Sequence, residues 1–146
     1  MPVTISRSLL DRLVAAAGAA AGEEICGLLV GREGAIEEAW PVANAAPDPR
    51  TGFLLDPEAH LAAARRARAE GRAILGHFHS HPSGDLTPSA ADAALAGEEG
   101  RLWLILGAEN ARLWISRRGG PVQGAFLPAR LEIRAERLET APSSAQ

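Results

Sequence analysis

Apolar residues near the start of the chain recur first at helical and then at strand spacing. A helix is expected from residue 8 to about residue 20, because apolar side chains recur there at intervals of three and four: Leu9, Leu10, Leu13, Val14 and Ala17. A short strand over residues 3–5 precedes it. A continuous apolar run within residues 24–31 ends at a glycine, and a strand-like stretch follows at residues 35–40. These two segments predict a hairpin.

The middle of the chain begins with a loop and continues with a helix that has clear signals at both ends. Residues 43–51 contain Pro, Asp and Gly and are expected to form the loop, with a short strand at residues 53–55 after it. Asp56 is a favourable N-cap, and Pro57 suits the first position of a helix. Gly71, preceded by several arginines, is typical of a helix C-terminus. A helix is therefore predicted between Asp56 and Gly71.

Strands dominate the second half of the chain. Residues 73–79 are predicted to form a buried strand that runs into a cluster of histidines. A short helix is expected from Pro88 to about residue 96, with Thr87 as its N-cap. Further strands are expected at residues 102–106, 111–115, 122–127 and 131–133. The alternation of strands and helices indicates an α/β sandwich with a mixed sheet.

Length and composition fit one globular domain. The chain has 146 residues, of which 47% are hydrophobic, and shows no second block of composition. We expect the domain to cover residues 1–138 and the polar residues 139–146 to be a disordered tail. The formal net charge of −3 argues against a nucleic-acid partner, because phosphate-binding domains usually carry a basic excess.

The compartment is expected to be the cytoplasm. Cys26 is the single cysteine, so it cannot form an intramolecular disulfide, and the N-terminal residues do not resemble a secretory signal. No stretch approaches the roughly 18 to 20 consecutive apolar residues that cross a bilayer, so no membrane span is expected.

Three of the four histidines fall at alternate positions of one short segment. His77, His79 and His81 would point to the same side of an extended chain, roughly 6.6 Å apart. Two imidazoles placed in this way can bind one cation, and neutral imidazole is a preferred zinc ligand. A strand end whose histidines only form hydrogen bonds is the alternative, and the histidines by themselves leave it open.

Ser89 and Asp92 lie three residues apart on the short helix predicted after the histidines. That spacing places both side chains on one helix face, where they can contribute to a site. The same spacing is that of a capping box, in which the two side chains only satisfy donors at the helix N-terminus. Because Thr87 and Pro88 already supply a cap and a first position, the site is the favoured interpretation.

The order and spacing of these residues resemble the signature of the JAMM, or MPN-plus, zinc metallopeptidases. The segment His79-Ser80-His81-Pro82, followed after six residues by Ser89-Ala90-Ala91-Asp92, is similar to H-x-H-P-x6-S-x-x-D. The family also has a glutamate three residues before a glycine in an upstream strand, and Glu24 and Gly27 match it.

The resemblance extends beyond the signature, over about residues 3–127. Asn44, Phe53 and the helix start at Asp56 and Pro57 are similar to the corresponding segment of small prokaryotic members. It implies the JAB/MPN fold, a cytidine-deaminase-like sandwich with a mixed, curved β-sheet flanked by helices.

The resemblance also implies a role for each residue of the signature. One Zn²⁺ per chain would be held by His79, His81 and Asp92, with a bound water as the fourth ligand. Two imidazoles, one carboxylate and an open position are a ligand set suited to catalytic zinc. Glu24 would act as general base, and Ser89 would donate a hydrogen bond to the developing oxyanion.

Neighbouring residues compete for some of these roles. Glu23 is equally acidic, but adjacent residues of a strand face opposite sides, and the family spacing to Gly27 selects Glu24. His77 shares the face of the other two histidines, yet packing or an indirect role beside the ligands is favoured over coordination. Cys26 lies in an apolar run and is expected to be a core residue.

The family resemblance implies a substrate class and leaves two alternatives open. JAMM proteins cleave peptide or isopeptide bonds, often after the C-terminal glycines of ubiquitin or its β-grasp relatives. Similarity to small prokaryotic members implies that the substrate and partner is a sulfur-carrier protein of the ThiS or MoaD type, or its conjugate; a homodimer is also compatible. The alternatives are a non-catalytic MPN-type interaction module and a RadC-like protein linked to DNA metabolism, which residues 81–89 also resemble.

Overall fold

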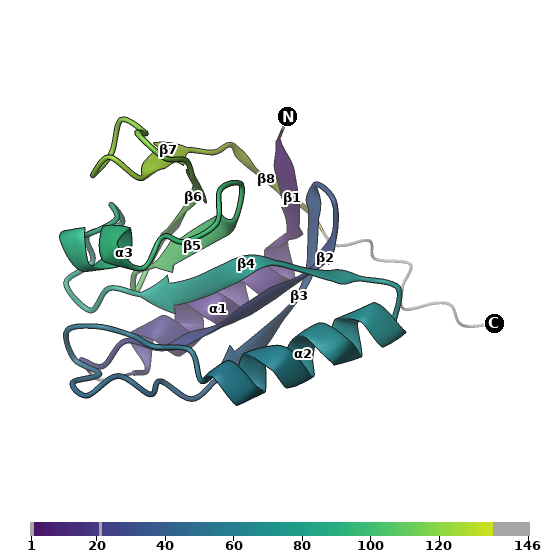
Figure 1. The fold of residues 1–146 in the computed structure, drawn as a ribbon, viewed down its shortest axis with the longest axis horizontal. Coiled ribbons are helices and arrows are strands. Elements are labelled where there is room, and N and C mark those ends of the chain that lie inside the picture. Colours follow the sequence, from purple (N-terminus) through teal and green to yellow (C-terminus); the bar gives the residue numbers. More distant parts are fainter. Residues whose placement is uncertain (1, 21, 136–146) are drawn as a thin grey trace.

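The computed structural model describes residues 2–20 and 22–135, which form one eight-stranded mixed sheet and three helices (Figure 1). The strands are β1 (Val3–Ser6), β2 (Cys26–Arg32), β3 (Ala35–Val42), β4 (Ala73–Ser80), β5 (Leu102–Leu106), β6 (Ala111–Ser116), β7 (Phe126–Pro128) and β8 (Leu131–Arg134). The helices are α1 (Arg7–Gly18), α2 (Pro57–Ala69) and α3 (Ala90–Ala94).

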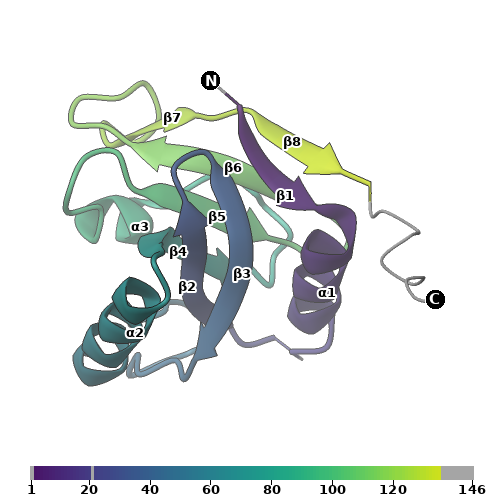
Figure 2. The same ribbon diagram turned by 90° about the vertical axis from the view of Figure 1, so that its right-hand side faces the viewer.

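The strand order across the sheet is β7-β6-β5-β4-β2-β3-β1-β8. The pairs β4–β5, β1–β3 and β1–β8 are parallel, and the others are antiparallel. The sheet curls strongly along this order (Figure 2). The predicted α/β class with a mixed, curved sheet is therefore confirmed, whereas the predicted boundary at residue 138 and the tail at 139–146 lie outside the described residues.

Helices α1 and α2 lie on opposite sides of the β2–β3 hairpin, as the two ribbon views agree (Figures 1 and 2). On the side of α1, Leu9, Leu13 and Phe78 share one buried cluster. A second cluster, on the other side of the sheet, contains Phe53 and Trp103. Because side chains alternate along β4, the residues on either side of Phe78 face this second cluster. Those residues are His77, which the prediction left out of the metal site, and His79, which it included.

The start of α3 differs from the prediction. Ser89, not Thr87, is the N-cap, and the helix begins at Ala90. The Ser89 side chain accepts from the amide of Asp92, while the Asp92 side chain accepts from the amide of Ser89, so a capping box is present. This reciprocal pair satisfies two amides that would otherwise lack a partner at the helix start, whereas a lone cap at Thr87 would satisfy one.

Two predicted strands also differ. Residues 53–55 do not form a strand, and only Leu55 makes an isolated bridge, with Asn44. The side chain of Asn44 instead bonds to the carbonyl of Gly52 and the amide of Leu54. The strand expected at residues 122–127 is confined to β7, since Val122 and Phe126 bridge each other across a tight turn. In the part of the chain that is described, no helix has the length and apolarity needed to cross a membrane.

Candidate metal centre

Antiparallel pairing of β2 with β4 brings an upstream glutamate to the histidines. Cys26 is paired with His79, and continuing this register by two residues sets Glu24 opposite His81. Ser80 joins the end of β4 to the residues just before β2. The amide of Ile25 donates to Ser80 Oγ at 2.9 Å, and the amide of Ser80 donates to the Ile25 carbonyl at 3.0 Å. The site is thus assembled by strand pairing between distant segments.

Three potential ligand groups converge beyond the end of β4. Nε2 of His79 lies 3.2 Å from Nε2 of His81. Asp92, which α3 supplies, places Oδ1 3.2 Å from His79 Nε2 and Oδ2 3.0 Å from His81 Nε2. Donor atoms around a tetrahedral zinc ion, at bond lengths of about 2.0–2.1 Å, are roughly 3.3–3.4 Å apart. The spacing and the chemistry of this set therefore fit zinc.

Glu24 belongs to a second, wider grouping. Its carboxylate and a nitrogen of each of His79 and His81 lie within 4.8 Å of one another, so these three could also hold an ion. We favour Asp92 as the third ligand because its oxygens already lie at ligand spacing from both imidazoles. Glu24 then lies beside the centre, where a proton acceptor would be placed.

The electrostatics of the cluster favour an anionic ligand between two imidazoles. Burial acts to raise the pKa of Asp92, but hydrogen bonds with His79 and His81 hold it well below its usual range. Burial lowers the pKa of His79 in spite of the hydrogen bond to Asp92. Burial also acts to lower the pKa of His81, yet its hydrogen bonds to Asp92 and to the backbone of Asp85 raise it on balance. Asp92 is therefore ionised over the neutral pH range.

A backbone hydrogen bond fixes the tautomer of His81. Its Nδ1 lies 2.7 Å from the carbonyl oxygen of Asp85, and since a carbonyl can only accept, Nδ1 must carry the proton. Nε2 then presents its lone pair toward the cluster when the ring is neutral, as metal coordination requires. No sequence signal pointed to Asp85, because only its backbone takes part.

Glu24 is the buried member of the acidic pair before β2. Its side chain is 8% exposed and Oε1 has no hydrogen-bond partner among the described residues, whereas Glu23 is exposed. Burial raises the pKa of Glu24 to about 7, although the neighbouring charge of His81 acts to lower it. A carboxyl with a pKa near neutrality can both accept and return a proton at physiological pH.

This raised pKa makes metal-free protein less stable at higher pH. The folded-state pKa of Glu24 is above its ordinary value of 4.5. Its contribution to the free energy of unfolding is therefore fully present below about pH 4.5 and is lost as the pH rises through 7. The loss is on the order of 2 kcal/mol. Urea unfolding of wild type and Glu24→Gln, both with a chelator, measures it. Between pH 4.5 and 8, wild type should lose stability relative to Glu24→Gln. A difference in unfolding free energy between the two proteins that stays constant over this range would contradict the raised pKa.

Ser89 combines its capping role with a place at the centre. It lines the same cavity as Glu24 and Asp92. Its Oγ accepts from the amide of Asp92 at 3.1 Å, which leaves its own O–H to donate. The capping box and the predicted donor role are thus compatible, because they use different parts of the hydroxyl.

Two residues acquire roles that composition and periodicity did not reveal. Asn44 Nδ2 donates to the carbonyls of Glu24 and Gly52 at 2.9 and 3.0 Å, and its Oδ1 accepts from the amide of Leu54 at 3.0 Å. Asn44 therefore ties the loop after β3 to the backbone of Glu24. Phe53, from that loop, stacks on the His79 ring with centroids 4.1 Å apart. The only sequence signal for either residue was its resemblance to small prokaryotic members.

His77 and Cys26 lie near the centre without joining the ligand cluster. The His77 ring packs against Trp103 at a centroid distance of 4.1 Å, and burial lowers its pKa to about 3, so the ring is neutral. Its Nε2 has no partner among the described residues. Cys26 is buried, as expected, and burial raises the pKa of its thiol to about 11, which makes it unreactive.

The sequence of this chain is similar to one protein family and to individual proteins of known name. Residues 6–117 match the family described as prokaryotic homologs of the JAB domain. The chain is 38% identical over 84 residues to a desampylase of Haloferax volcanii, covering 56% of this chain and 60% of that protein. It is 33% identical over 121 residues to a probable TtuB-protein conjugate cleaving protease of Thermus thermophilus, covering 81% of this chain and 78% of that protein.

Solved structures agree with the sequence comparison. A protein of Desulfitobacterium hafniense superposes with a TM-score of 0.79 at 27% identity, over 94% of this chain and 96% of that one. A JAB1/MPN domain protein of Archaeoglobus fulgidus superposes with a TM-score of 0.56 at 20% identity, over 90% and 98% of the two chains, and shows the shared fold. The family match covers most of the chain, including the histidines, Ser89 and Asp92, and the chain therefore belongs to the prokaryotic homologs of the JAB domain.

Proposed function

We propose that this protein is a zinc-dependent isopeptidase that hydrolyses an amide bond after the C-terminal glycines of a ubiquitin-like protein. One observation carries the proposal: the Nε2 atoms of His79 and His81 lie 3.2 Å apart, and Asp92 places one carboxylate oxygen 3.2 Å from the first and the other 3.0 Å from the second. The Glu24 carboxylate lies beside them. A zinc ion held by these three residues would supply Lewis-acid chemistry, lowering the pKa of a water molecule to about 7 and polarising the substrate carbonyl.

The side chains around the centre would handle the protons and the charge of the reaction. Glu24 takes a proton from the attacking water and delivers it to the nitrogen of the leaving amine. Burial, which raises the pKa of Glu24 in the metal-free protein, favours uptake of this proton. Ser89 donates its O–H to the oxyanion that develops on the carbonyl. Phe53 covers the His79 ring and, with Asn44 holding its loop, limits the access of solvent to the buried side of the centre.

The substrate class is supported by the relatives. One relative bears the name desampylase and another is named for cleaving conjugates of TtuB, and both names describe removal of a protein modifier from a conjugate. We extend this to a β-grasp sulfur-carrier protein of the ThiS or MoaD type, or its conjugate, as the substrate of this chain.

Intact-mass analysis tests the proposal directly. A panel of β-grasp carriers, each with a C-terminal Gly-Gly and an amide-linked extension, is incubated with zinc-loaded protein. Cleavage after the terminal glycines is the expected result, and a chelator should abolish it. If zinc binds in a one-to-one ratio but no carrier is cleaved, the substrate class is wrong. If no zinc binds, the non-catalytic interaction module becomes the better interpretation.

A further inference from the structure

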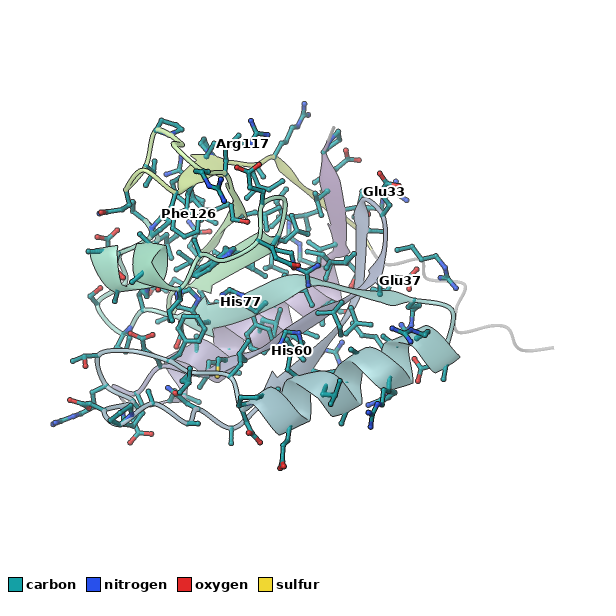
Figure 3. The ribbon with its side chains drawn as sticks, viewed as in Figure 1. Glu33, Glu37, His60, His77, Arg117 and Phe126 are labelled. Atoms are coloured by element: carbon teal, nitrogen blue, oxygen red, sulfur yellow. The ribbon has the colours of Figure 1, made fainter. Side chains whose placement is uncertain are left out.

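A second cavity, of about 260 Å³, adjoins the candidate metal centre. His60 of α2 and His77 of β4 line it from two elements that lie side by side (Figure 3). Most of the remaining wall is apolar and consists of Leu28, Phe53, Leu54, Leu55, Leu95 and Trp103. None of these residues is assigned to the proposed chemistry except Phe53, which covers His79.

The second cavity shares part of its wall with the one that holds the proposed catalytic groups. Phe53, Leu54 and Leu95 line both of them, and the neighbouring cavity also contains Glu24 and Asp92. Leu54 comes from the loop after β3, whereas Leu95 follows α3. A substrate chain that extends from the centre into the second cavity would therefore contact these two leucines, which border both cavities.

The two shared leucines are open to solvent. The residue Leu54 is 43% exposed and Leu95 is 48% exposed, although both border a cavity. Exposed large apolar side chains gathered at one place usually mark a binding surface. Covering them with an apolar group would remove this surface from water, which favours binding.

Size and charge restrict what the cavity can accept. Its volume is below the roughly 300–1,000 Å³ of sites for drug-sized ligands, so one or two side chains fit better than a cofactor. Glu98 and Arg101 at its rim lie 4.0 Å apart and carry opposite charges that offset each other. The cavity therefore does not select a charged group.

We infer that this cavity is a specificity pocket that accepts one large aliphatic side chain of the substrate segment entering the centre, with Leu54 and Leu95 setting the preference. The inference rests on the proposed function and adds a sequence requirement close to the scissile bond. A pocket that gains or loses a single methylene discriminates by about 10-fold or more, so leucine should exceed alanine by at least that factor in kcat/KM.

The test scans leucine, alanine and aspartate through each position near the scissile bond of a Gly-Gly-linked β-grasp carrier. Wild type should prefer leucine over alanine by about 10-fold or more at one position. Leu95→Ser and Leu54→Ser should each lower this preference toward unity. Leu61→Ser is the matched control, because Leu61 is 54% exposed on α2 but lines neither cavity, and it should keep the wild-type preference.

Equal cleavage rates for leucine and alanine at every position would contradict the specificity pocket but would still agree with the proposed isopeptidase function. If no carrier is cleaved at all, peptides that carry the same scanned residues are titrated into Glu24→Gln. Binding is followed by the NMR resonance of the Trp103 indole N–H. Tighter binding of one leucine peptide, lost in Leu95→Ser, would support the pocket without the proposed chemistry. Equal binding of all peptides would reject the pocket as well.

Discussion

Replacing Glu24 with glutamine is expected to lower kcat by about 10²–10⁴-fold while leaving zinc affinity nearly unchanged. Glutamine has almost the same shape as the protonated carboxyl, and burial already favours the neutral form of Glu24, so the fold should tolerate the substitution. An amide cannot take a proton from water and return it to the leaving amine. Single-turnover cleavage of the carrier substrate, together with zinc titration against a chromophoric chelator, measures both quantities.

Glu23→Gln is the matched control for this experiment. It makes the same substitution one residue away, but Glu23 is exposed, so the activity of this variant should stay within about two-fold of wild type. Full activity in Glu24→Gln would exclude Glu24 as the proton acceptor. Equal losses in the two variants would indicate a general effect of negative charge on substrate binding.

Asp92→Asn is expected to weaken zinc binding by more than about 100-fold, since even residues that only support a metal ligand contribute 10- to 100-fold. The carboxylate of Asp92 presents one oxygen to His79 and the other to His81, and asparagine has only one acceptor atom for both. The variant also loses the negative charge that makes the cluster attractive to a cation. Competition with a chromophoric chelator measures the affinity.

The control for Asp92 is Asp85→Asn. Asp85 lies on the adjacent loop, where its exposed carboxylate accepts from the amide of Thr87, so zinc affinity should be unchanged. Thermal unfolding in the presence of chelator shows whether either substitution disturbs the fold. If Asp92→Asn binds zinc normally and Glu24→Gln does not, the ligand set is the wider grouping of Glu24 with the two histidines.

Local patterns predicted most of the secondary structure because their signals act within a few residues. Asp56 and Pro57 start α2 as expected, and the apolar run before Gly31 forms β2. Local patterns failed where two neighbouring segments can each start a helix. At α3, Thr87-Pro88 and Ser89-x-x-Asp92 are both plausible helix starts, and the reciprocal hydrogen bonds of the second decide the outcome.

The loop after β3 shows a different limit of sequence patterns. Residues 53–55 have the apolar character of a strand, but the amide of Leu54 donates to the side chain of Asn44, and only its carbonyl accepts from a backbone amide, that of Ala45. A side chain that replaces a strand partner leaves no periodic signal. Stacking of Phe53 on His79 is equally invisible, because the two residues are far apart in the chain.

Residue types and short spacings by themselves indicated two parts of the site, the histidines at alternate positions and a carboxylate on the following helix. The glutamate before an apolar strand came from the family resemblance. Only the tertiary structure decided that these groups meet. The antiparallel register of β2 and β4 sets Glu24 opposite His81, and the position of α3 carries Asp92 to both imidazoles. Register depends on backbone pairing between distant segments and on which face is buried, so no local pattern contains it.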